Sequence, residues 1–140
     1  MVSMETATEI KEKTLAMGAR AVGIASVEAI NRFAPPGHRP SDQLKGAQSV
    51  VVLGGGEPTG GAWKTGTNRV LGSIGYNRGQ LASSARQLSY FIEERYGYCA
   101  IPIPTGDWVG HYPYMSLKVC AEMAGLGTRS MAAGILLNQQ

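Results

Sequence analysis

Residues 49–53 form an uninterrupted β-branched and apolar run behind one serine, Ser49-Val50-Val51-Val52-Leu53. A run of this length and composition predicts a strand that is covered on both faces. Upstream, the short apolar run Ala21-Val22-Gly23-Ile24-Ala25 predicts another strand. Helical patterns precede, separate and follow these two runs. Strands that alternate with helices indicate the α/β class, with a mixed sheet flanked by helices.

The helical patterns differ in length. Thr6-Ala7-Thr8-Glu9 has the spacing of a capping box and predicts a first helix that ends at Gly18. Ser26 is expected to cap a brief helix through Ile30. A long helix is expected from a cap at Asn77 to a stop at Gly97. Its apolar residues recur at spacings of four, three and four: Leu81, Ala85, Leu88 and Ile92.

The remaining segments are less regular. Residues 34–40, with three prolines and a glycine, predict a surface loop. Residues 54–75 hold eight glycines in 22 residues and predict either a mobile insertion or a loop that orders over a ligand. A strand is expected over 98–104, where prolines place it at an edge or end it. A helix over 115–124 and a strand over 134–138 complete the expected elements.

Composition bounds the class of protein. The 140 residues are expected to form a single domain, 1–140, and an apolar share of 44% is enough for a core. The net charge of +3 comes from scattered basic residues, which argues against a nucleic-acid partner. No apolar run has the length of a membrane span, and the start resembles no export signal, so we expect a cytoplasmic protein. Cys99 and Cys120 are expected to be buried and to hold no metal.

The densest group of polar and aromatic side chains lies in residues 106–115, between an expected strand and an expected helix. Open α/β proteins bind ligands at such junctions. Four side chains there can donate or accept a proton: Asp107, His111, Tyr112 and Tyr114. The alternative is a structured loop whose aromatic rings pack on the core. His38, in the proline-rich loop, is expected to pin that loop by a hydrogen bond.

Several segments, in order, resemble the amino-terminal domain of the epoxyqueuosine reductase and reductive dehalogenase superfamily. Together they cover nearly the whole chain from residue 21 onward. The first two are 21–25 and Pro36-Gly37-His38-Arg39-Pro40, and the third runs from Leu44 to Gly54. The other three are Tyr96 to Pro104, Ser116 to Gly127 with its Ala-Gly-Leu-Gly ending, and Gly134 to Asn138.

The resemblance implies a nitroreductase-like fold that binds cobalamin, with no protein histidine on the cobalt. It implies an oxidoreductase that receives electrons from iron–sulfur clusters of a following domain, which this sequence lacks. The implied cofactor-binding residues are Tyr76, Asn77, Tyr112, Met115, Lys118, Leu126 and Gly127. His111 falls near the place of the family's acidic proton donor, so His111 and Tyr112 are the expected catalytic residues. A glycine-rich, charge-poor chain suits a large, flat, mostly apolar ring.

Three alternatives stay open at this stage. The chain is a corrinoid carrier or scavenger without catalysis, or a nitroreductase-like protein that binds flavin mononucleotide (FMN). A third alternative is that it is the front part of a longer iron–sulfur protein, since residues 139–140 follow directly on an expected strand. The substrate is not identified by any pattern, and a homodimer is an alternative to a monomer.

Overall fold

The computed structural model describes residues 2–56, 59–103, 108–109, 112–113, 115–129 and 136–137. Within them, helices and short strands follow one another along the chain. The helices are α1 (Met4–Ala16), α2 (Val27–Asn31), α3 (Pro40–Gln43), α4 (Gly60–Trp63), α5 (Thr67–Tyr96) and α6 (Leu117–Met123). The strands are β1 (Ala21–Ser26), β2 (Ser49–Gly54), β3 (Trp108–Val109), β4 (Tyr112–Pro113), β5 (Thr128–Arg129) and β6 (Leu136–Leu137).

The central sheet is the antiparallel pair β1–β2. Its register runs from Ala21 opposite Gly54 to Ser26 opposite Ser49. The two other strand pairs of the described residues, β3–β4 and β5–β6, are also antiparallel and have two residues in each strand. The α/β class is therefore confirmed in its coarse form, as a small protein with a two-stranded antiparallel sheet and helices. The expected mixed sheet is wrong for the described residues, because every strand pair in them is antiparallel.

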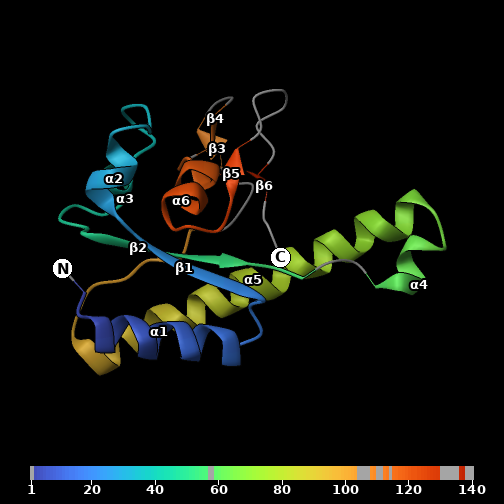
Figure 1. Ribbon diagram of the computed structural model, residues 1–140, viewed down its shortest axis with the longest axis horizontal. Coiled ribbons are helices and arrows are strands. Elements are labelled where there is room, and N and C mark those ends of the chain that lie inside the picture. Colours follow the sequence, from blue (N-terminus) through green and yellow to red (C-terminus); the bar gives the residue numbers. More distant parts are fainter. Residues whose placement is uncertain are drawn as a thin grey trace.

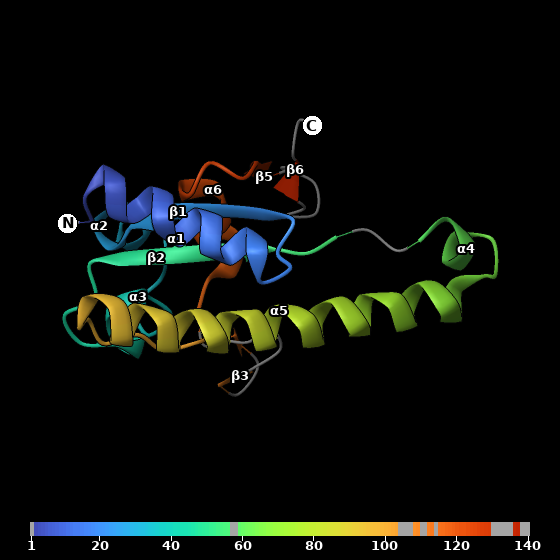
Figure 2. The same ribbon diagram turned by 90° about the horizontal axis from the view of Figure 1, so that it is seen from below.

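Helices lie on both faces of this sheet (Figures 1 and 2). On one face lie α1 and α5, and on the other lie α6 and the short helix α2. The best buried cluster joins β1, α2 and α6. Its members are Ala25, Ile30, Ala34, Met115, Val119 and Cys120. Burial of these apolar side chains holds α6 and α2 against the sheet.

A glycine sets how closely α6 approaches β1. A Cβ atom placed on Gly23 would lie 2.5 Å from the backbone oxygen of Ala124 and 2.9 Å from the Cβ atom of Ala124. Any side chain at this position would therefore push the end of α6 away from the strand. Close packing of α6 thus explains why a glycine stands inside the predicted strand 21–25.

On the opposite face, α1 and α5 are joined by polar contacts. The Ser84 hydroxyl, only 2% exposed, donates to the carbonyl of Met17 at 2.8 Å. Near the other end, the Tyr96 hydroxyl donates to a carboxylate oxygen of Glu9, and Arg95 donates from Nε to the other oxygen at 3.2 Å. These bonds fix the two helices in register along their length.

Five expected elements are confirmed with small shifts. The first helix begins at Met4 behind the N-cap Ser3, so the capping box predicted at Thr6–Glu9 is wrong. The helix ends at Ala16, two residues before Gly18, and the strand predicted over 21–25 extends by one residue. The hydroxyl of Ser26 caps α2 by accepting from the Ala29 amide at 3.1 Å. The strand predicted over 49–53 is β2, and the helix predicted over 115–124 is α6, shorter at both ends.

The long helix starts eleven residues earlier than expected. Its N-cap is Gly66, with φ of 97°, and it runs for 30 residues to Gly97, whose φ of 70° ends it as predicted. Asn77 is therefore not a cap but lies inside the helix. The first part of α5 extends away from the sheet, with α4 beside its first turns (Figures 1 and 2). We call residues 59–79 the arm. Most of the predicted glycine-rich loop is thus helical.

One other expected strand is wrong. Residues 98–103 form no strand, although one was predicted over 98–104. Pro102 lacks an amide hydrogen for a ladder, which explains part of this difference. Of the strand predicted over 134–138, the described part is β6. The loop predicted over 34–40 is confirmed up to its last residue, Pro40, which begins α3.

Candidate functional site

A cavity of about 920 Å³ lies along β2. Its walls come from the second half of α5, the segment 97–103 and α6. Every residue from Gln43 to Gly55 lines it, as expected when the edge of a strand, and not one face, borders a space. Because β2 pairs only with β1 in the described residues, its other edge has no strand partner there. The cavity therefore offers backbone donors and acceptors as well as apolar walls.

The apolar walls come from β2, α5 and α6. Val50 and Val52 contribute from the strand, Leu81 and Leu88 from α5, and Met115 from the start of α6. Cys120 also lines the cavity, and burial raises the pKa of its thiol to about 11. The thiol is therefore neutral at physiological pH and acts as part of the apolar wall, not as a charged ligand for a metal.

The charges around the cavity have one sign. Its described lining contains three cations, Lys45, Arg78 and Lys118, and neither aspartate nor glutamate. All three side chains are exposed, so they stand at the rim while the interior is apolar. Such a lining favours a ligand that is largely apolar and carries neutral or anionic substituents.

Three of the predicted cofactor-binding residues lie at this cavity. Met115, Lys118 and Leu126 all line it, although they are spread over 12 positions of the sequence. Met115 is only 5% exposed and belongs to the core cluster as well. Gly127 is described but does not line the cavity. Lys118 lies in the first turn of α6, and Met115 and Leu126 lie just outside its two ends.

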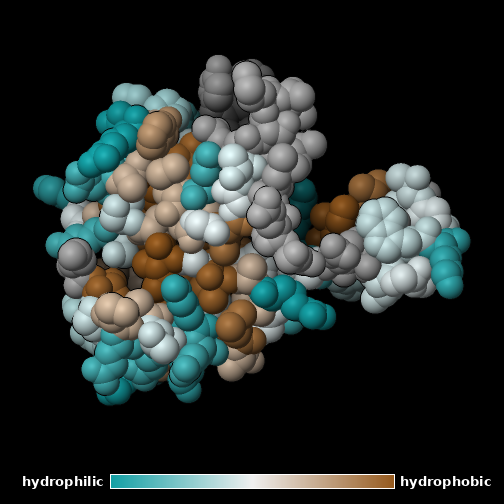
Figure 3. Space-filling view, in the orientation of Figure 1, coloured by the Kyte–Doolittle hydropathy of each residue, from teal (hydrophilic) through white to brown (hydrophobic). Residues whose placement is uncertain are grey.

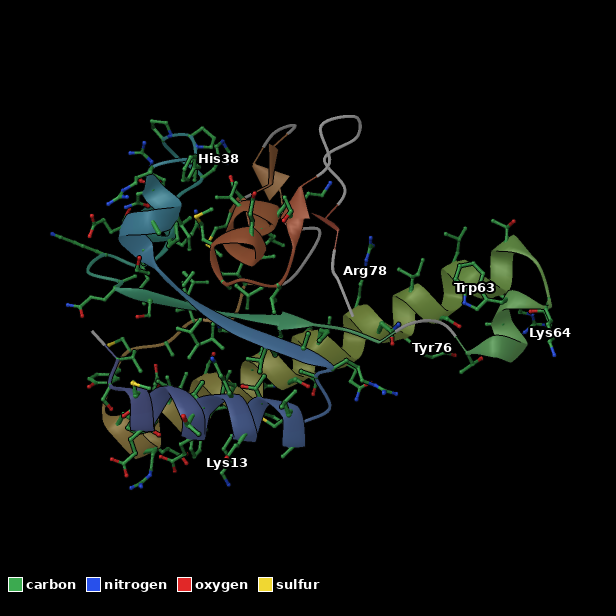
Figure 4. All side chains as sticks on the ribbon, viewed as in Figure 1. Lys13, His38, Trp63, Lys64, Tyr76 and Arg78 are labelled. Carbon is green, nitrogen blue, oxygen red and sulfur yellow. The ribbon has the colours of Figure 1, made fainter. Side chains whose placement is uncertain are left out.

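The other predicted residues have different positions. Tyr76 is 85% exposed and lies on the opposite side of α5 from Arg78 (Figure 4). Asn77 donates from Nδ2 to the carbonyl of Gly56 at 2.6 Å, which ties the helix to the segment after β2. Tyr112 is described only as part of the backbone of β4, and His111 lies outside the described residues. The predicted proton donors are thus neither placed at the cavity nor placed away from it.

Sequence reasoning missed Lys45, Arg78 and the whole edge of β2. One signal could have indicated them. No acidic residue occurs between Asp42 and Glu57, or between Glu57 and Glu93, and these two stretches supply β2 and most of α5. An absence of carboxylates on two neighbouring elements predicts a surface suited to an anionic or neutral ligand.

The other predicted chemical residues lie elsewhere. The backbone of His38 accepts a hydrogen bond from the Ser116 amide at 3.2 Å, which pins the proline-rich loop to the start of α6. Cys99 is exposed, so the expectation that both cysteines are buried is wrong for it and confirmed for Cys120. Among the described residues, no three His, Cys, Asp or Glu side chains gather as a metal-binding group. Their helices include none with the length and apolarity needed to cross a bilayer.

Comparison of the chain with protein-family models, with curated proteins and with solved structures finds no match.

Proposed function

We propose that the cavity along β2 binds a corrinoid, and that the chain is the cofactor-binding part of a cobalamin-dependent reductase. The observation that carries this proposal is the cavity itself. Its volume of about 920 Å³ is near the upper end of the range of roughly 300–1,000 Å³ for small-molecule pockets. A site of this size suits a cofactor built on a large ring.

The lining fits the chemistry of a corrinoid. The ring is mostly apolar, which suits the side chains of β2, α5 and α6, and its amide arms suit the free backbone groups at the edge of β2. The phosphate of its nucleotide tail suits the rim cations Lys45, Arg78 and Lys118.

When bound, a corrinoid supplies a cobalt centre that can take part in reductive cleavage of carbon–oxygen or carbon–halogen bonds. The residues of this chain bind and orient the ring and exclude water from one side of it. Electrons come from an iron–sulfur donor, either a separate protein or another domain. His111 and Tyr112 stay the proposed proton donors, on the grounds of their titratable side chains and their place in the sequence.

A titration with hydroxocobalamin tests the binding proposal. Protein at about 10 micromolar is expected to shift the visible spectrum of the cofactor and to co-elute with it, with micromolar or tighter affinity. Reversal of rim charges, Arg78→Glu or Lys118→Glu, is expected to weaken binding about tenfold each. Lys11→Glu, a charge reversal on the exposed side of α1, is the matched control. Absence of both spectral change and co-elution contradicts the proposal.

FMN is the second candidate, because it also joins a flat ring to a phosphate and meets the same rim cations. The same titration with FMN separates the two. Quenching of flavin fluorescence together with an unchanged cobalamin spectrum would replace the corrinoid by a flavin.

Catalysis is tested separately from binding. With the corrinoid bound and a chemical reductant supplied, His111→Ala or Tyr112→Phe is expected to lower turnover of a halogenated substrate by roughly 10²-fold. Corrinoid affinity should stay within about threefold of that of the unmodified chain. Tight corrinoid binding without turnover under any reductant would favour the carrier function.

A further inference from the structure

The exposed side of α5 carries a regular seam. From Arg69 to Glu93, exposed residues recur at alternating spacings of three and four, which place them on one line along the helix. We call this line the outer seam. The buried side of the same helix, which includes Ser84 and Leu88, packs toward α1 and β2. Viewed from below, α5 is uncovered along its whole length (Figure 2).

Glycines in this seam have no explanation within the chain. Gly72 and Gly79 lie in the interior of α5, where glycine is among the least favourable residues. A Cβ atom on either would meet no atom of the described residues within 4 Å. Neither residue has a left-handed backbone. Close packing inside one chain therefore does not require them, whereas close approach of a second helix would.

The order of residues along the seam is self-complementary. When two copies of α5 lie antiparallel about a two-fold axis near Leu81, position i faces position 162 minus i of the other copy. Arg69 then faces Glu93 of the second copy, a pair of opposite charges. Gly72 faces Tyr90 of the second copy, so a small residue lies against a large one. Each contact occurs twice because the interface is isologous.

The middle of the seam shows the same matching. Tyr76, 85% exposed, faces Arg86 of the second copy, and a guanidinium over a phenol ring is attractive. In the single chain Arg86 already lies 5.7 Å from the ring centre of Tyr90. Gly79 faces Ser83 of the second copy next to the axis, where two small residues let the helices approach closely. In a parallel arrangement each charged residue would instead face the same residue of the second copy, which carries the same charge.

We propose that the outer seam is the interface of a two-fold homodimer, formed by antiparallel packing of two copies of α5. Leu71 and Ile74, the exposed apolar side chains of the arm, lie off this seam and continue the apolar spacing of Leu81. In the space-filling view apolar atoms are visible on the arm (Figure 3). The occupant of the seam is thus a second copy of this chain, because its charges and its sizes match only when the same sequence runs in the opposite direction.

Sedimentation velocity on the purified chain tests the proposal. At about 50 micromolar a dimer is expected. Gly72→Leu combined with Gly79→Leu should weaken it at least tenfold, while circular dichroism shows helix content equal or higher, because leucine favours the helix. Gly60→Leu with Gly61→Leu, in α4 and off the seam, is the matched control. A monomer at this concentration, or a dimer unchanged by the seam leucines, overturns the proposal.

Charge exchange tests the antiparallel register. Arg69→Glu or Glu93→Arg alone places like charges together and should weaken the dimer about tenfold. The double variant restores opposite charges and should return the affinity to within about threefold. Glu93 also accepts a hydrogen bond from the Ala100 amide, so Glu93→Arg can weaken the dimer through a change within one chain. Recovery of dimer affinity in the double variant is therefore the deciding result. A double variant as weak as the singles overturns the register and with it the interface.

Discussion

Among single residues, Glu9 makes the most polar contacts between α1 and α5. The hydrogen bond from Tyr96 and the interaction with Arg95 hold the pKa of the Glu9 carboxyl below its ordinary value of 4.5. Desolvation and the same bond to Glu9 raise the pKa of the Tyr96 hydroxyl above its ordinary 10.0. The pair therefore links the two helices most strongly in the pH range between these two values.

The sign of the pH dependence follows from these shifts. Because the Glu9 pKa is lowered by folding, its stabilisation is lost as pH falls below about 4.5. Because the Tyr96 pKa is raised, its stabilisation is lost as pH rises above about 10. We expect urea unfolding at about pH 3, 7 and 10.5 to show this dependence in the free energy of unfolding. Glu9→Gln should reduce the loss of stability between about pH 7 and pH 3, and Tyr96→Phe should reduce the loss between about pH 7 and pH 10.5. Glu12→Gln, on the same helix, is the control. The same dependence of the unfolding free energy on pH in Glu9→Gln and in the unmodified chain would contradict the role given to Glu9.

The two cysteines should differ strongly in reactivity. Cys99 is exposed, while Cys120 is 1% exposed and burial raises its pKa to about 11. Thiolate is the reactive form, so at about pH 8 Cys120 should react with Ellman's reagent at least 10²-fold more slowly than Cys99. One thiol per chain is expected to react in the native protein and two in urea. Cys99→Ser should remove the fast phase, and two equal fast phases would contradict the buried position of Cys120.

Among the elements, the contact of β1 with α6 depends on one glycine. Gly23→Ala would bring a methyl group within 2.5 Å of the Ala124 carbonyl oxygen. We expect this overpacking to lower the free energy of unfolding by about 1–3 kcal/mol. Gly61→Ala, where the nearest atom to the new Cβ is 3.9 Å away, should leave stability nearly unchanged. The urea midpoints of both variants measure this, and equal midpoints would show that α6 can shift without cost.

Element types were predictable where one periodicity dominates. The apolar runs 21–25 and 49–53 correctly gave β1 and β2, and Gly97 correctly ended α5. The start of α5 was missed because Gly72 and Gly75 indicate a loop when they are judged one by one. Leu71 and Ile74 carry the apolar spacing of the helix upstream past Asn77, and that signal could have extended it. The contacts proposed for Gly72 and Gly79 lie outside the chain, so they leave no signal in the local sequence.

The candidate site was predictable only in part, for a related reason. Met115, Lys118 and Leu126 lie in or beside one helix, and the family resemblance named them together. Lys45 and Arg78 reach the same cavity from the segment before β2 and from α5, which are far apart in sequence. Which distant elements meet depends on sheet pairing and helix packing, and the antiparallel β1–β2 pair was not the sheet expected.

For the whole molecule, α5 has two surfaces with separate proposed partners. Residues 81–92 of its inner side border the cavity, whereas the outer seam faces away from the sheet. A ligand in the cavity contacts β2 and the second half of α5, and a second copy of the chain contacts the full length of the seam. Cofactor binding and dimer formation should therefore protect different residues of α5 from hydrogen exchange.

Hydrogen exchange can distinguish the two binding events. At a cofactor concentration about 100 times its Kd, binding stabilises the folded chain by about 2.7 kcal/mol. Added protection is expected in β2, whose free edge borders the cavity, and in residues 78–92 of α5, while residues 67–76 of the arm stay unchanged. Dilution below the dimer Kd should instead lower the protection of α5 along the whole outer seam, residues 69–93, and leave β2 unaffected. Protection by the cofactor that is equal along all of α5, or absent from β2, would show that the ligand does not occupy this cavity.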